Sequence, residues 1–146
     1  MQNQTLSADQ EKLKSIAVSI YHAWEKALAN KDIEGLLKLY AQDAIVESPL
    51  IPHLLGAFPG ICVGQVELRR FIEQIIQRQP SIRRFYMQNL FTDGKTLIFE
   101  YPRQSPEGEQ MDFMEVVEIK DGLIQHHKVY WGWRGFKVMQ DNLHWC

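Results

Sequence analysis

The hydrophobic periodicity of this chain changes once, near residue 80, and this change limits the folds open to it. Before that point apolar side chains recur three and four residues apart, which is the spacing of one helix face. From residue 82 they fall in strand-length runs separated by turn residues, including the hairpin dipeptides Asp93-Gly94 and Asp121-Gly122. Consecutive hairpins that follow a set of helices predict an α+β fold with the helices on one face of the sheet.

Three helices are predicted in the first half. Ser7 and Gln10 have capping-box spacing, so we predict a first helix from about residue 7 to residue 30. Asp32 can cap a short second helix, and a third runs from about residue 65 to Pro80. A short strand at residues 44–47 leads into a loop at 49–64 with three prolines and three glycines. Because this loop is also apolar, it is expected to cover a pocket mouth or a subunit interface.

The second half predicts four strands, at residues 82–91, 96–101, 111–119 and 123–131. A chain of 146 residues fits one domain, so we predict a single domain over 1–146 with its core at about 10–135. Alternation places Met114, Val116 and Tyr130 on the outer face of the sheet. We expect homodimerisation through that face to cover them.

Composition and charge exclude several classes of function. The net charge is −2 and the basic residues are dispersed, so we expect no binding to nucleic acid or to anionic membranes. No apolar run is long enough to span a membrane, and the polar first ten residues lack a signal-peptide core, so the cytoplasm is the expected location. Cys62 has apolar neighbours and is expected to be a buried structural cysteine. The histidine spacing matches no metal motif, and no glycine-rich nucleotide loop is present, so no metal or cofactor is expected.

Several segments together resemble a known family. They are Asp32 to Leu37, Leu39 to Ala44, Glu47 to Pro49, Phe113 to Glu118 and Asp121 to Ile124. They resemble nuclear transport factor 2-like domains, and the SnoaL-like branch in particular, over residues 10–135. The resemblance implies a cone of about three helices packed on a curved, mostly antiparallel sheet around an apolar pocket. Most members are dimers that pack sheet against sheet.

The catalytic sets of two enzyme groups in this superfamily are incomplete here. Where ketosteroid isomerases place an oxyanion tyrosine and a general-base aspartate, this chain has Trp24 and Ser48. Only Glu115 keeps a suitable group, at the position of their second oxyanion acid. Limonene epoxide hydrolases use an Asp–Arg–Asp arrangement, and the corresponding positions here are Glu100, Ile98 and Gly132. Steroid isomerisation and epoxide hydrolysis are therefore not expected.

Alternation and the resemblance together predict the pocket. They turn Ile98 and Glu100 inward on one strand, Glu115 on the next, and Gln125 and His127 on the last. We predict Glu115 and His127 as an acid–base pair, with Glu100 as a third catalytic residue. The predicted ligand-binding residues are Tyr21, Trp24, Tyr40, Glu47, Phe58, Phe71, Val129 and Trp131. A carboxylate among such side chains has a raised pKa, and a neighbouring histidine favours its charged form again, which suits proton transfer near neutral pH.

The sequence leaves three functions open. The first is a cofactor-independent enzyme of isomerase, cyclase or hydratase type that acts on a small hydrophobic molecule. The second is a non-catalytic ligand-binding or dimerisation domain. The third is a protein-binding role for the aromatic segment at residues 129–136, whose bland alternative is a hydrophobic plug at the dimer edge. Fold alone does not separate them, because one scaffold hosts many activities.

Overall fold

The computed structural model describes residues 2–78, 82–105 and 107–141. The helices are α1 (Gln2–Ala29), α2 (Ile33–Leu37), α3 (Leu50–Leu55), α4 (Gly64–Arg78) and α5 (Trp133–Asp141). The strands are β1 (Tyr40–Glu47), β2 (Ile61–Val63), β3 (Asn89–Thr92), β4 (Thr96–Glu100), β5 (Arg103–Gln104), β6 (Gln110–Met111), β7 (Phe113–Lys120) and β8 (Leu123–Trp131).

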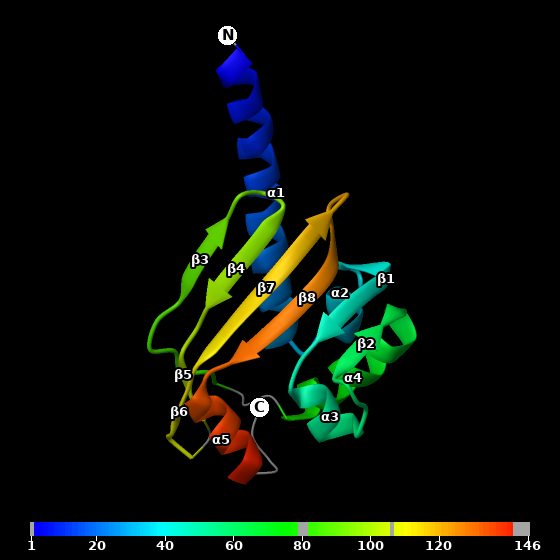
Figure 1. Cartoon of the computed structure of the whole chain (residues 1–146), viewed down its shortest axis with the longest axis vertical. Coiled ribbons are helices and arrows are strands. Elements are labelled where there is room, and N and C mark those ends of the chain that lie inside the picture. Colours follow the sequence, from blue (N-terminus) through cyan, green and yellow to red (C-terminus); the bar gives the residue numbers. More distant parts are fainter. Residues whose placement is uncertain (1, 79–81, 106, 142–146) are drawn as a thin grey trace.

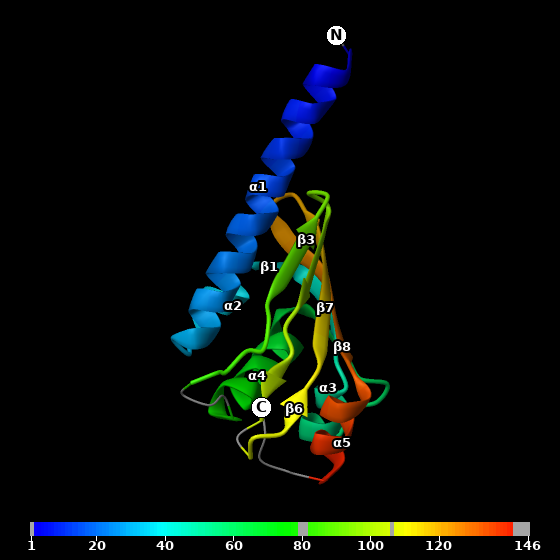
Figure 2. The same cartoon turned by 90° about the vertical axis from the view of Figure 1, so that its left-hand side faces the viewer.

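Six strands form one curved sheet in the order β2-β1-β8-β7-β4-β3, and β5 pairs separately with β6. The pair β1 and β8 is parallel, whereas the other pairs of this sheet are antiparallel. The sheet remains open, with α3 and α5 gathered at one end of it (Figure 1). Helices α1, α2 and α4 lie on one side of the sheet (Figure 2). The predicted α+β cone with a mostly antiparallel sheet is confirmed.

Local signals set several of these elements. The Asp32 carboxylate accepts a hydrogen bond from the Gly35 amide at 2.9 Å, so it caps α2 as predicted. The first helix begins earlier than Ser7, because residues 2–6 contain no glycine or proline to interrupt it. Residues 82–91 form less strand than predicted, since only β3 and an isolated bridge between Phe85 and Arg103 occur there.

Two segments predicted as irregular contain helices. The loop at 49–64 holds α3 and β2, and α3 ends at Gly56 in the left-handed conformation with φ of 64°. The residues after Trp131, where no helix or strand is predicted, form α5. This helix buries Gly135, Val138 and Met139, which are three and four residues apart and so share one face. Burial of these side chains therefore stabilises the helix. The aromatic residues of the segment hid its helical spacing in the sequence.

The core lies between the helices and the concave face of the sheet. Along β7, the inward side chains Phe113, Glu115 and Val117 are buried, and the intervening ones are more exposed. Met114 and Tyr130, at 40% and 48% exposure, lie on the outer face as predicted. In the described part of the chain, helices pack against only one face of the sheet.

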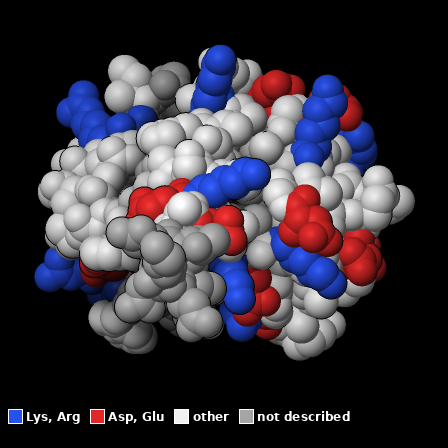
Figure 3. All heavy atoms as spheres, turned by 90° about the horizontal axis from the view of Figure 1, so that it is seen from above, with Lys and Arg blue, Asp and Glu red and all other residues white. Residues whose placement is uncertain are grey.

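The surface fits the charge balance of the sequence. On the face drawn in Figure 3, acidic and basic side chains are interspersed instead of forming a large patch of one sign. No described helix combines the length and hydropathy that crossing a membrane requires.

Cys62, in β2, is a free and buried thiol whose pKa is raised by burial to about 11, as expected for a structural cysteine.

Candidate functional site

A cavity of about 100 Å³ lies between the concave face of the sheet and helices α1 and α4. Its walls are mostly aliphatic and aromatic side chains, such as Leu68, Phe71 and Phe113. The polar groups on its wall include the side chains of Tyr40, Tyr101, Glu115 and His127. An apolar cavity with a few convergent polar groups is the usual form of a small-molecule site.

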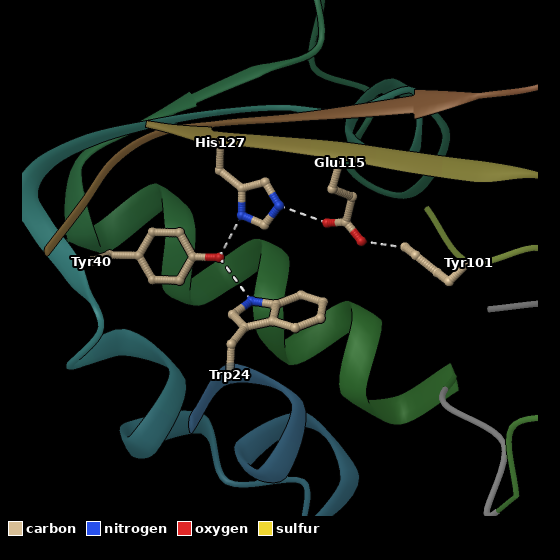
Figure 4. A network of polar contacts seen from close by, with 5 residues as sticks. All are labelled: Trp24, Tyr40, Tyr101, Glu115 and His127. Carbon is tan, nitrogen blue, oxygen red and sulfur yellow. Dashed lines mark hydrogen bonds and ion pairs between the residues drawn. The ribbon is translucent and has the colours of Figure 1, made fainter. Parts of the chain in front are cut away.

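Five side chains form a continuous chain of hydrogen bonds at this cavity (Figure 4). The indole nitrogen of Trp24 donates to the Tyr40 hydroxyl at 3.1 Å, and this hydroxyl lies 2.8 Å from Nδ1 of His127. Nε2 of His127 lies 2.6 Å from Oε1 of Glu115. The hydroxyl of Tyr101 donates to Oε2 of the same carboxylate. The network thus connects α1 with β1, β8 and β7.

One arrangement of protons satisfies every group in this network. With His127 neutral, its Nε2–H donates to the Glu115 carboxylate and its Nδ1 accepts from the Tyr40 hydroxyl. The Tyr40 oxygen then accepts from Trp24, whose indole can only donate. If His127 gains a second proton, Nδ1–H donates to the Tyr40 oxygen and the phenolic proton is released to point elsewhere. The network therefore has two proton states that differ in where Tyr40 directs its proton.

The site is strongly desolvated. The exposure of Glu115 is 2% and that of His127 is 3%. Burial raises the pKa of the Tyr40 hydroxyl, although the hydrogen bond from Trp24 partly opposes this. Burial, followed by the charge of Glu115, raises the pKa of Tyr101 well above that of an ordinary tyrosine. Both phenols therefore keep their protons at neutral pH and act as hydrogen-bond donors.

Aromatic packing holds the network in place. The ring of Tyr101 stacks between those of Phe99 and Phe113, at centroid distances of 5.8 and 5.2 Å. Tyr40 lies nearly parallel to the His127 imidazole, with 12° between the planes. Such contacts restrict the rotamers of both tyrosines and so maintain the hydrogen-bond geometry.

The structure brings together most of the predicted site. Glu115 and His127 are hydrogen-bonded to each other at the cavity wall. The predicted ligand-binding residues that line the cavity are Trp24, Tyr40, Phe71, Val129 and Trp131. Tyr21 lies beside the ring of Phe99 and is not part of this wall.

Three predicted site residues lie elsewhere. Glu100 pairs across the strands with Met114, so it shares the outer face, and the predicted inward orientation of Glu100 is wrong. Glu47 is also on the outer face, where it contacts His126, because the inward neighbour in β1 is Val46. Phe58 lies in the loop after α3 and is 85% exposed, so its predicted place in the pocket is wrong as well.

A one-residue shift of facing explains the error on β4. Leu97 and Phe99 are buried where Ile98 and Glu100 were predicted to be. In a strand such a shift moves every side chain to the opposite face. On β8 a bulge opposite Glu118 and Ile119 turns Ile124 inward in place of Gln125, which instead bonds to Asp43.

Besides Ser48, the sequence interpretation missed three larger polar residues of the cavity wall. They are Tyr101, Arg83 and Arg103. Tyr101 could have been found from the sequence, because Leu97, Phe99 and Tyr101 are large apolar or aromatic residues two positions apart, the spacing of one strand face. Arg83 pairs with Glu25 of α1 at 2.8 Å, and Arg103 stacks over the ring of Phe113 at 5.1 Å. No local pattern marks these two arginines as inward-facing.

Among the described residues, no group of three or more His, Cys, Asp and Glu side chains is arranged to hold a metal ion.

Comparison with known proteins agrees with this fold. The model of the SnoaL-like domain matches residues 21–127, which is most of the chain. The protein therefore belongs to the SnoaL-like domain family, within the nuclear transport factor 2-like fold. A search of curated proteins gave no match.

Solved structures with the same fold share little sequence with this chain. An NTF2-like protein from Anabaena variabilis has a TM-score of 0.66 and 16% identity, over 83% of this chain and 90% of its own. A SnoaL-like protein from Burkholderia thailandensis has a TM-score of 0.64 and 16% identity, over 81% and 95%. TerC, co-crystallized with polyporic acid, has a TM-score of 0.68 and 14% identity, over 87% and 99%. These likenesses establish the fold.

Proposed function

We propose that this protein is a cofactor-independent enzyme that transfers a proton on a small, largely hydrophobic, oxygen-containing molecule. The observation that carries the proposal is the Glu115–His127 pair, buried in an apolar cavity and hydrogen-bonded at both ends to tyrosines. Titratable groups gathered in a desolvated cavity are characteristic of acid–base sites. TerC was co-crystallized with polyporic acid, and we expect this chain to bind a small organic molecule as well.

The network suggests a role for each group. A carboxylate offers about four lone-pair sites, and the protein uses two of those on Glu115, which leaves capacity to accept a proton from a carbon beside a carbonyl. When Nδ1 of His127 carries a proton and donates to the Tyr40 oxygen, the Tyr40 hydroxyl is free to donate a hydrogen bond to the carbonyl oxygen as it becomes an enolate. His127 joins the two groups. Return of the proton from Glu115 to another carbon completes an isomerisation. In a cyclisation, the enolate carbon instead attacks a second carbonyl carbon of the same molecule, the π bond of that carbonyl breaks, and its oxygen takes the proton back from Glu115.

The test uses exchange of carbon-bound protons, which detects the first step without knowledge of the natural product. The protein is incubated in D2O with a panel of small cyclic ketones and 1,3-diketones, and loss of α-proton signals is followed by NMR. We expect Glu115→Gln to slow exchange by about 10²–10⁴-fold, the usual contribution of a general base. The matched control is Glu118→Gln, which changes a carboxylate on the same strand that faces outward.

Two outcomes would contradict the catalytic proposal. One is exchange that is equally fast in the Glu115→Gln variant and the wild type. The other is saturable binding of panel members with no exchange above the buffer rate. The second result would identify the protein as a ligand-binding domain, the alternative that the sequence left open.

We also propose that the protein is a homodimer whose outer sheet faces pack together. Met114 and Tyr130 leave apolar surface on this face, and His126 with Glu47 and Glu118 provides a polar cluster beside it. Light scattering is expected to give twice the 17.1 kDa chain mass. Met114→Asp should shift the protein toward monomer, because it would bury an unpaired charge. A monomeric wild type at micromolar concentration would contradict this proposal.

A further inference from the structure

The parallel pair β1 and β8 separates next to the candidate site. Its last paired residues are Glu47 and Lys128, and the residues that follow them are Ser48 and Val129. Beyond this point β1 turns into α3, whereas β8 continues beside β7 (Figure 1). The sheet has no ladder hydrogen bonds between the two diverging segments. Beyond the last pair, the two faces of the sheet are therefore separated by side chains instead of by hydrogen-bonded backbone.

A second hollow lies on the outer side of the sheet at the point where β1 and β8 stop pairing. It has a volume of about 310 Å³, and we call it the outer groove. Its walls include Pro49, Pro52, Pro59 and Tyr130. Ser48 and Val129 line both the outer groove and the inner cavity, so the two hollows share a wall. Helix α3 also contacts both, because Leu50 faces the cavity and Pro52 faces the groove.

The inner cavity is small for a complete substrate site. Its volume of about 100 Å³ is below the ~300–1,000 Å³ of pockets that enclose drug-sized ligands. With the outer groove included, the available space enters that range. Three prolines, Val129 and Tyr130 supply the apolar walls of the groove, and the charged side chains of Glu47 and Lys128 also border it. This composition suits a flat or linear apolar group.

We infer that the outer groove is a second subsite of the same binding site, entered between Ser48 and Val129. The ligand is then an elongated molecule: a compact, oxygen-bearing ring occupies the inner cavity beside Glu115 and His127, and an apolar tail extends along the groove. The position of the ring rests on the proposed function. The position of the tail rests on the wall that the two hollows share.

The test uses phenol and the 4-alkylphenols with ethyl, butyl and hexyl chains, titrated into the full-length protein and followed by NMR. We expect Kd to fall about three- to fourfold for each added methylene, which is the effect of burying one such group. Tyr130→Ala and Pro52→Ala each remove part of one groove wall. Each should weaken 4-hexylphenol binding by about fivefold and leave phenol binding unchanged.

Two controls keep the result specific. Tyr86→Ala changes an exposed tyrosine that lines neither hollow and should leave the whole series unchanged. Pro52 lies off the sheet, so its variant separates the groove from any effect of Tyr130 on the dimer. If phenol binds but Kd is independent of chain length, or if the gain persists in both groove variants, the second subsite is wrong and the proposed function stands. If no phenol binds and no ketone exchanges its protons, both are wrong.

Discussion

Replacement of Glu115 by alanine is expected to lower the free energy of unfolding by about 3–5 kcal/mol, because it leaves two buried donors without an acceptor at a cost of about 1–3 kcal/mol each. The carboxylate accepts hydrogen bonds from His127 and Tyr101, and it is 2% exposed. Without it, two donors are left in an apolar surround that offers them no replacement. Urea unfolding monitored by circular dichroism measures the difference.

Glu118→Ala is the matched control for this prediction. Glu118 lies on the outer face of the same strand and is largely exposed, so its removal should change stability by less than about 0.5 kcal/mol. Equal effects of Glu115→Ala and Glu118→Ala would show that the network contributes little to stability.

Replacement of Gly94 by alanine is expected to destabilise the protein by about 2–4 kcal/mol, through backbone strain and overlap together. Gly94 has a φ of +98°, a conformation that L side chains rarely adopt. A Cβ there would lie 2.6 Å from Cβ of Leu13 and 3.0 Å from the backbone nitrogen of Lys14. The β3–β4 turn and α1 would have to move apart, because the second of these contacts is with backbone.

The second Asp-Gly turn provides the control. Gly122 has a φ of +75°, but a Cβ there would meet no atom within 4 Å. Gly122→Ala should therefore carry only the conformational term of about 1–2 kcal/mol. Thermal unfolding of the two variants in the same buffer gives the comparison. Equal losses of stability would mean that the contact between Gly94 and α1 is unimportant.

The candidate site shows which side-chain orientations could be predicted from residue patterns and which could not. Alternation along β7 and β8 correctly predicted that Glu115 and His127 face the same cavity, because both strands keep the period of two over the relevant residues. The inward orientation of Glu100 depended on the facing of β4, which was assigned one residue out of step. Tyr101 was missed through the same shift. The resemblance predicted the fold correctly, and it could not supply the roles of residues in which this chain departs from its relatives.

Loops and chain ends were predicted least well. Helices α3 and α5 form in segments rich in proline, glycine and aromatic residues, and their buried side chains meet distant parts of the chain. The outer groove was not foreseeable either, since it depends on the point at which β1 and β8 stop pairing. Glu47 and Lys128, which pair at this point, are 81 positions apart in the sequence.

The sequence by itself determined the order of the main helices and strands, the capped start of α2, the two Asp-Gly turns and the inward orientation of Glu115 on β7 and His127 on β8. Each of these depends on backbone preferences and side-chain period within a few residues. Only the tertiary structure decided the facing of β4, the bulge in β8, the joining of Trp24 and Tyr40 to the Glu115–His127 pair, and which Asp-Gly turn packs against α1. The physical reason is that hydrogen-bond register and packing are set by partners remote in the chain, which local preferences do not specify.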